Sequence, residues 1–213
     1  MIKRLKLTIL SLLVSVGIFA SETSVKNKQG VEIWYEFNTD TKWACVRRAP
    51  SKYSGNVIIP ATVVYQGVEY SVVVIDNYAF NDCSNLTSVT IPESVTSIEW
   101  GTFCGCSSLT SVTIPEGVTM IGEDAFYNCT NITSITCKCI IPPMAKSAFG
   151  DFDTSIPLFV PEESIELYRN TNSWKKFTNI HPIPTDWTPL IIGAIVFAVV
   201  CVLIGLWIGK RKK

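Results

Sequence analysis

The side chains that usually carry catalytic chemistry are scarce in this chain of 213 residues. His181 is the one histidine, and because it stands just before Pro182 and close to an apolar run, we expect it to be a linker residue. A Ser/His/Asp set needs a histidine placed inside the fold, and the sequence contains no glycine-rich phosphate loop and no paired-carboxylate motif. We therefore predict that the protein is not an enzyme.

A glycan-active enzyme is the alternative that the carboxylates leave open. Its acid/base pair would have to come from residues such as Glu93, Glu116 and Glu123. Glu93 and Glu116, however, each follow a proline and occupy equivalent positions of a repeated pattern. Repetition at equivalent positions indicates solvated turns, so we expect no catalytic residues here.

Cysteine is the remaining residue type with metal-binding or covalent chemistry. Of the eight cysteines, Cys201 lies in an apolar C-terminal run, and the other seven cannot all pair with one another. Recurrence at one position of the repeated pattern favours a column of buried thiols at Cys83, Cys106 and Cys129. The Cys-x-Cys pairs at 104–106 and 137–139 leave a zinc site, or a disulfide at Cys137 or Cys139, as alternatives. Zinc sites space paired cysteines more widely, so we expect no metal and no cofactor.

Composition and charge exclude further classes. The chain is 47% hydrophobic and 17% charged, which predicts a folded protein and not a disordered one. All 18 Asp and Glu lie between the two ends, whereas seven of the 18 Lys and Arg lie at the ends, so the middle carries a net charge of −7. An acidic, exported middle with one histidine predicts no binding to nucleic acid.

Both ends of the chain carry export and membrane signals. Residues 1–20 place basic residues ahead of an apolar run and then small residues, as a secretory signal peptide does. Leu190–Gly209 contains no charge and as a helix would span about 30 Å, the thickness of a hydrocarbon core. Trp187 and Trp207 lie near its ends, and the basic residues 210–213 indicate a cytoplasmic tail. We expect a single-pass membrane protein whose domain is extracellular or periplasmic.

The middle of the chain is organised by a 23-residue internal repeat. The unit has the pattern L-T-S-V-T-I-P-E-x-V-T-x-I-x-x-x-x-F-x-x-C-x-x. Besides the three cysteines, the expected core columns are Phe80, Phe103, Phe126 and Phe149, with Leu86, Leu109 and Ile132. So many positions that recur at the same 23-residue interval cannot be explained by amino-acid composition alone.

Each unit predicts a short coil of chain. Leu86–Ile91 is rich in β-branched residues and ends at Pro92, which predicts a strand, and Val95–Ile98 predicts a second, shorter strand. Residues 101–106 are expected to form a turn or helical fragment with Phe103 and Cys106 facing inward. One unit buries too little apolar surface to offset the entropy of ordering it, so the units must stack.

The flanks depart from the period as terminal caps would. Residues 31–37 and 43–46 predict a hairpin over the first open edge, and an insertion at 64–71 has its turn at Gln66-Gly67. The last unit has four extra residues before Ile141-Pro142.

Downstream, residues 158–161 predict a final strand and residues 162–170 a short helix, with Trp174 and Phe177 packing over the last coil. The chain is thereby divided into a signal peptide (1–20), an N-terminal hairpin cap (21–56), repeats (57–150), a C-terminal cap (151–183), a linker (184–189), a transmembrane helix (190–209) and a basic cytoplasmic tail (210–213).

The run from Asn77 to Pro92 resembles the BspA-like leucine-rich repeat family, and the resemblance covers about residues 31–183. That family is abundant on the surfaces of mucosa-dwelling anaerobic bacteria. The resemblance implies a mainly β, short leucine-rich-repeat solenoid and a role in adhesion or in binding host or microbial macromolecules. It implies no catalytic residues.

The candidate binding face is the set of hydroxyl side chains that the strands leave for solvent. A lattice of hydroxyls on a rigid sheet would bind an extracellular protein or glycan through many weak hydrogen bonds, although threonine is also simply a favourable residue on an exposed strand. A structural envelope protein with no host-binding role is the alternative function. The residues of the face are Thr87, Ser88, Thr90, Thr110, Ser111, Thr113, Thr133, Ser134 and Thr136.

Overall fold

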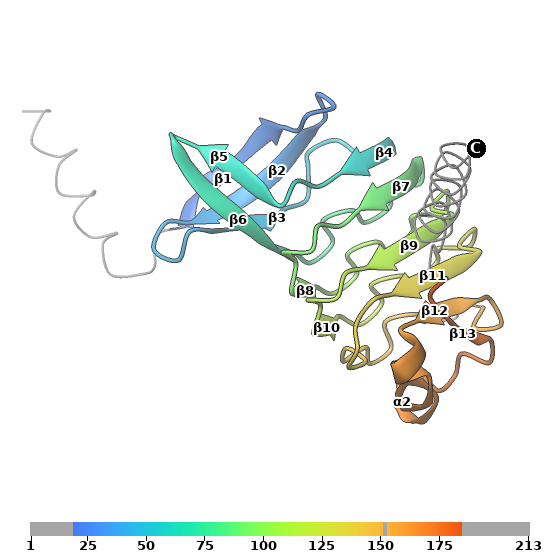
Figure 1. Cartoon of the computed structure of the whole chain (residues 1–213). Helices are drawn as coiled ribbons and strands as arrows, with labels where there is room; N and C mark the ends of the chain where they lie inside the picture. The colour runs from blue at the N-terminus through green and yellow to red at the C-terminus, as the bar shows by residue number, and fades with distance from the viewer. Residues whose placement is uncertain (1–18, 151–152, 185–213) are drawn as a thin grey trace, which may run out of the picture. The chain divides into compact units, whose positions relative to one another are not determined.

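The computed structural model describes residues 19–150 and 153–184, and this part of the chain is mainly β (Figure 1). The described residues up to Ile183 form one compact unit. Most of the predicted signal peptide, the linker from residue 185, the predicted transmembrane helix and the basic tail lie outside the described residues. Within the described ranges, no helix has the length and apolarity needed to cross a membrane.

The predicted N-terminal hairpin is confirmed and has a third strand beside it. Strands β2 (Glu32–Asn38) and β3 (Trp43–Val46) pair antiparallel, and β1 (Phe19–Lys26) pairs antiparallel with the other edge of β2. The alternation of β2 buries Ile33, Tyr35 and Phe37. The sequence did not indicate β1 because that segment is mostly polar and has no apolar face; its first two residues fall within the predicted signal peptide.

A second hairpin joins this cap to the repeats. Strands β5 (Thr62–Tyr65) and β6 (Val68–Ile75) pair antiparallel, and Gln66-Gly67 form the turn between them that the sequence predicts. Both turn residues have positive φ, 49° and 77°, which suits the right-handed twist of a hairpin. Strand β6 also pairs parallel with β3 and with β8 (Ser97–Ile98), so one strand connects the cap with the first short strand of the repeats.

The longer strands of the coils line one side of the repeats. Strand β9 (Ser111–Ile114) pairs parallel with β11 (Ser134–Cys137), each residue opposite its equivalent in the next repeat. The parallel order continues through β12 (Leu158–Val160) to β13 (Ile180–Pro182). Strand β4 (Gly55–Ile58) pairs parallel with β7 (Leu86–Thr90), and on a second side β8 pairs with β10 (Met120–Ile121).

The longer strands do not form one continuous sheet, contrary to the single rigid sheet on which the predicted hydroxyl lattice depends. Strands β7 and β9 lie beside each other but belong to different sheets, β4–β7 and β9–β11–β12–β13. At this step the coils are joined by the short strands β8 and β10 and by the turns. The N–H of Phe80 donates to the carbonyl of Thr102 (2.8 Å) and that of Asp82 to Cys104 (2.7 Å).

The turns carry the core column of phenylalanines. Consecutive rings of Phe80, Phe103, Phe126 and Phe149 have centroids 5.1, 5.4 and 5.7 Å apart, and all four side chains are fully buried. Tyr53 contacts the first ring, and Trp174 and Phe177 contact the last. The ring column is therefore closed at both ends by the caps.

Two backbone positions in each turn adopt the left-handed conformation. One precedes the phenylalanine by two residues and the other follows it by two, and φ lies between 44° and 75° at every one of them. This conformation changes the direction of the chain sharply on either side of the phenylalanine, so only a few residues around it reach the core. The first position holds Tyr78, Gly101, Asp124 and Ser147, and the second holds Asp82, Gly105, Asn128 and the equivalent Gly150 of the last described turn, which is one residue earlier.

Side chains cover open backbone groups at both ends of the repeats. At the first end, Ile58 at the end of β4 donates its N–H to Oε1 of Gln29 (3.1 Å) and accepts at its carbonyl from Nδ2 of Asn27 (2.8 Å). These backbone groups of the edge strand are therefore not available for pairing with another chain.

At the other end, a short 3-10 helix, η1 (Glu162–Ser164), leads into α2 (Ile165–Asn170). Ser164 Oγ donates to the carbonyl of Ile140, Tyr168 Oη to that of Cys139 and Trp174 Nε1 to that of Pro143, each at 2.8 Å. Burying these carbonyls without a partner would cost about 1–3 kcal/mol each. The predicted short helix, together with Trp174 in the turn that follows it, thus caps the last coil through side chains.

Replacing Phe103 with alanine is expected to lower the free energy of unfolding by about 3–5 kcal/mol, because a cavity would open in the middle of the ring column. Leu167→Ala is the control, since that side chain is 47% exposed on α2 and should cost well under half as much. Urea unfolding of the full chain in detergent, followed by tryptophan fluorescence, measures both. A loss at Phe103 no larger than that at Leu167 would contradict the described core.

Candidate functional site

None of the nine predicted face residues is buried: seven lie in β7, β9 and β11, and Thr110 and Thr133 come just before β9 and β11. In β9, Ser111 and Thr113 are exposed while Val112 and Ile114 are buried, and β11 repeats the alternation with half-buried hydroxyls. The period of two in a strand produces this separation, because successive side chains point to opposite faces. The strands that place apolar side chains in the core therefore also place hydroxyl side chains on the opposite face.

The parallel register arranges the hydroxyls in columns. Ser111 pairs with Ser134 and Thr113 with Thr136, and the N–H of Thr133 donates to the carbonyl of Thr110 (2.9 Å). The first coil contributes the equivalent residues Thr87, Ser88 and Thr90. Because β7 lies in a different sheet from β9, however, these three residues are separated from the other six, and the expected single lattice is divided in two.

Most of the hydroxyls keep their hydrogen-bonding capacity. Ser88 Oγ donates to Oδ1 of Asn56 (2.8 Å), and Thr133 Oγ1 donates to the carbonyl of Thr110 (3.2 Å). Among the hydrogen bonds of the described residues, none uses the hydroxyls of Thr113 or Thr136. A hydroxyl can donate one hydrogen bond and accept others, so this face can contact either a peptide or a sugar.

An aromatic pair extends the face beyond the hydroxyls. In register, Thr136 lies opposite Phe159 of β12, and Phe159 lies opposite His181 of β13. The two rings have centroids 5.8 Å apart, and His181 Nε2 lies 2.6 Å from Oδ1 of Asn179.

The prediction that His181 is a linker residue is therefore wrong. Pro182 suggested a linker, but a proline is tolerated in an edge strand, and β13 is the edge strand of its sheet. The signal that could have found β13 is the need of the preceding predicted strand, β12, for a partner on its open edge.

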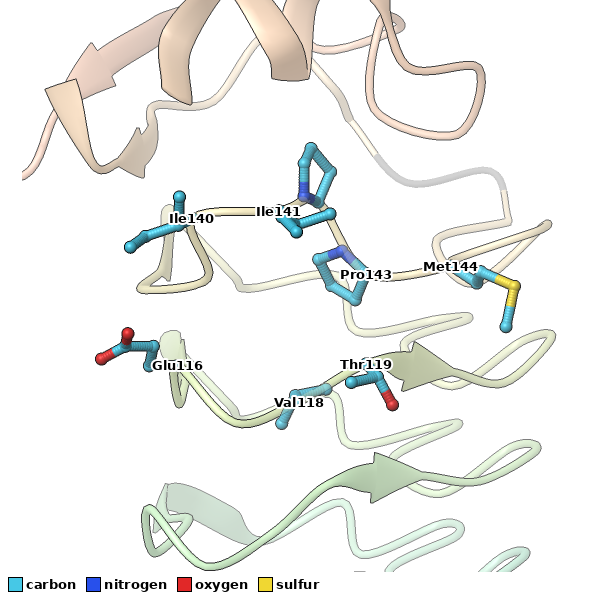
Figure 2. Close-up of a pocket in the computed structure, with 8 residues that line it drawn as sticks. Glu116, Val118, Thr119, Ile140, Ile141, Pro143 and Met144 are labelled. Carbon is cyan, nitrogen blue, oxygen red and sulfur yellow. The ribbon is translucent and has the colours of Figure 1, made fainter. Parts of the chain in front are cut away.

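An apolar hollow of about 400 Å³ lies just after the strands, between two successive coils (Figure 2). Glu116, Val118 and Thr119 line it from one coil, and the segment 140–144 lines it from the next. Ile141 and Met144 are 76% and 71% exposed. The four extra residues of the last unit produce this segment, and their length alone did not indicate that apolar side chains would be left in solvent.

Of the three carboxylates considered for a catalytic pair, Glu93 makes contacts between successive coils. Glu93 lies 2.7 Å from Nζ of Lys138 and accepts from the N–H of Glu116 (3.3 Å). The Lys138 hydrogen bond lowers the pKa of Glu93, which is the opposite of what a general acid needs near neutral pH. These contacts agree with solvated turns that link successive coils.

The seven described cysteines are free thiols, so no disulfide involves Cys137 or Cys139 in this structure. The column predicted from the repeat donates to backbone: Cys106 Sγ to the carbonyl of Phe80 and Cys129 Sγ to that of Phe103, both at 3.1 Å. Burial raises the pKa of Cys129 to about 12 and holds its thiol protonated. In the described part of the chain, no three His, Cys, Asp or Glu side chains are grouped as metal ligands.

The repeats and part of their caps are similar to known proteins. Residues 68–181 match the family model described as a BspA type leucine rich repeat region, in six copies. A crystal structure of a leucine rich repeat protein from T. pallidum is similar over 71% of this chain and 80% of its own, with 16% identity and a TM-score of 0.50.

A leucine-rich repeat protein from Bacteroides capillosus shares 22% identity over 56% of this chain and 99% of its own, with a TM-score of 0.41. A leucine rich cell surface protein from Faecalibacterium prausnitzii shares 19% identity over 68% of this chain and 50% of its own, with a TM-score of 0.32. No curated protein matches the chain.

Thiol labelling should separate the cysteines by exposure. Cys104 is only partly buried, whereas Cys83, Cys106 and Cys129 are buried, and a thiol must reach solvent and ionise before it reacts. Iodoacetamide treatment of the folded chain at mildly alkaline pH, read by peptide mapping, should label Cys104 first and the column only in denaturant. Labelling of Cys106 as fast as Cys104, or a disulfide-linked peptide containing Cys137 or Cys139, would contradict this.

Proposed function

Because the chain belongs to the BspA-type leucine-rich repeat family, we propose that it is a non-enzymatic, membrane-anchored surface protein that binds an extracellular protein or glycan. The binding surface in this proposal is the exposed strand face of the repeats. The observation that carries it is the register of β9 and β11, which sets serine and threonine hydroxyls opposite their equivalents in the next repeat. The coils in this proposal form a short solenoid.

The chemistry of the face suits recognition through many weak contacts. The hydroxyls of Thr113 and Thr136 are uncharged, so a partner loses little by displacing water from them. Parallel ladders fix the backbone beneath them, and a rigid surface loses less conformational entropy on binding than a mobile one. Phe159 adds an apolar ring at one end of the same face, and aromatic side chains are enriched where interfaces are strongest.

The membrane anchor in this proposal is the apolar segment 190–209, with the basic residues 210–213 on the cytoplasmic side. The signal peptide at 1–20 would export the domain, so the strand face would be extracellular or periplasmic. Both assignments rest on the sequence, because these segments lie outside the described residues.

A structural envelope protein with no host-binding role is the second candidate. The apolar hollow favours it, because exposed side chains such as Ile141 and Met144 are typical of surfaces that contact another protein. In that case the contact would be with a neighbouring envelope component.

A double substitution on the strand face tests the binding proposal. Thr113→Lys with Thr136→Lys places two like charges at paired positions of the face and should weaken capture of the partner by at least about tenfold. The matched control is Thr96→Lys with Thr119→Lys, two exposed threonines that are also equivalent in successive coils but lie on the short-strand side.

The measurement is binding of the full chain in nanodiscs to arrays of extracellular matrix proteins and of glycans, with circular dichroism as a check of folding. Equal binding by both double variants would remove the site from this face. No binding by the unmodified chain would favour the structural alternative.

A further inference from the structure

The turn side of the coils, away from the strand face, carries two exposed aromatic rings in contact. Tyr78 and Trp100 are 37% and 49% exposed, and their ring centroids lie 5.8 Å apart at an interplanar angle of 42°. The residues belong to successive coils. Large apolar side chains in solvent do not contribute to the core, and exposed apolar patches often mark sites of interaction.

Backbone contacts hold both rings in place. The N–H of Tyr78 donates to the carbonyl of Trp100 (2.9 Å), and the N–H of Trp100 donates to Oδ1 of Asn77 (3.1 Å). The ring of Tyr78 lies across Gly101, where an added Cβ would be only 2.5 Å from Cε1 of the ring. A glycine at position 101 thus makes room for the tyrosine ring against the next coil.

Tyr78 is also the bulkiest residue at its position in the repeat. It has φ of 57°, and the equivalent positions with the same left-handed conformation hold glycine, aspartate and serine. A bulky side chain is disfavoured there by about 1 kcal/mol or more. The fold therefore does not require a tyrosine at this position.

The coil that follows Trp100 and Gly101 carries two acidic residues. Glu123 and Asp124 occupy the positions equivalent to Trp100 and Gly101, and the N–H of Gly101 donates to the carbonyl of Glu123 (2.9 Å). Among the described residues, no ion pair neutralises either carboxylate. Lys146, at the equivalent position one coil farther, makes no ion pair with Glu123 in this part of the chain.

A third carboxylate adds to the negative charge of this side. Asp82 lies against the next coil, because a Cβ added at Gly105 would be 2.5 Å from its Oδ1. Burial raises the pKa of Cys104, and the charges of Asp82 and Asp124 raise it further. Asp82 is partly compensated by Lys52, whose Nζ lies 3.8 Å away. The uncompensated negative charge therefore lies on the coil next to Trp100.

Exposed aromatic faces beside unpaired carboxylates are complementary to a cation. The faces of Trp and Tyr attract a positive charge through the ring quadrupole. Among biological cations, the guanidinium of arginine is planar, weakly hydrated and stacks on aromatic rings while it bonds to carboxylates. The same charges repel phosphate, sulfate and carboxylate groups.

We propose that Tyr78, Trp100, Glu123 and Asp124 form a site for an arginine side chain in a basic segment of a partner protein. The guanidinium stacks on Trp100 and Tyr78 and pairs with the carboxylates of the next coil. This turn-side site is distinct from the strand face. The proposal therefore does not depend on the function proposed for that face.

The test uses the full chain in nanodiscs and a labelled, flexible glycine/serine peptide that carries several arginines, at physiological salt. A matched peptide with citrulline in place of arginine has the same shape without the charge. The arginine peptide should bind, and Trp100→Ala should weaken its binding by about tenfold. Glu123→Gln with Asp124→Asn should weaken it several-fold and reduce its dependence on salt.

Tyr78→Gly separates binding from folding. Glycine accepts the left-handed conformation, so this variant should unfold at a urea concentration no lower than that of the unmodified chain while it binds the peptide more weakly. Leu167→Ala, which removes an exposed apolar side chain from α2 outside both proposed sites, is the control and should leave peptide binding unchanged.

Three results would overturn the proposal. One is equal affinity for the citrulline and arginine peptides, and another is unchanged arginine-peptide binding in both Trp100→Ala and Tyr78→Gly. The third is absence of peptide binding together with binding of a neutral oligosaccharide that Trp100→Ala abolishes, which would assign the rings to glycan recognition.

Discussion

No coil of this protein can bury its own upper and lower surfaces, and every coil must therefore lie against another coil or a cap. The phenylalanine rings and the inter-coil hydrogen bonds of the turns meet this requirement within the repeats. At the ends, side chains take the place of the missing coil. Asn27 and Gln29 cover one end, and Ser164, Tyr168 and Trp174 cover the other.

The same requirement determines which side chains are available for binding. Residues that face the core are fixed by packing, whereas those between them are free to vary in chemistry on a rigid frame. The strand side presents uncharged hydroxyls and ends in Phe159, and the turn side presents Tyr78 and Trp100 next to carboxylates. A leucine-rich repeat fold with few coils thus offers two chemically different surfaces.

The sequence predicted features that repeat and missed those that depend on contacts between distant segments. The repeat period identified the phenylalanines, because their spacing and type recur, and alternation identified the hairpin around Asn38. It did not reveal the break between β7 and β9, which depends on how two coils align, or strand β13, which pairs with β12 across the intervening helix and loops. Nor did it single out Tyr78, because a left-handed conformation at a tyrosine follows from the turn and not from the residue type.

Amide hydrogen exchange of the full chain in nanodiscs tests the dependence of each coil on its neighbours most directly. The N–H groups of Phe80, Phe103 and Phe126 each donate to the next coil. They should exchange only through global unfolding, with one common free energy and one common dependence on urea, while the turn amide of Gly30 opens locally. Exchange of any one of the three by an independent, low-energy opening would contradict the account.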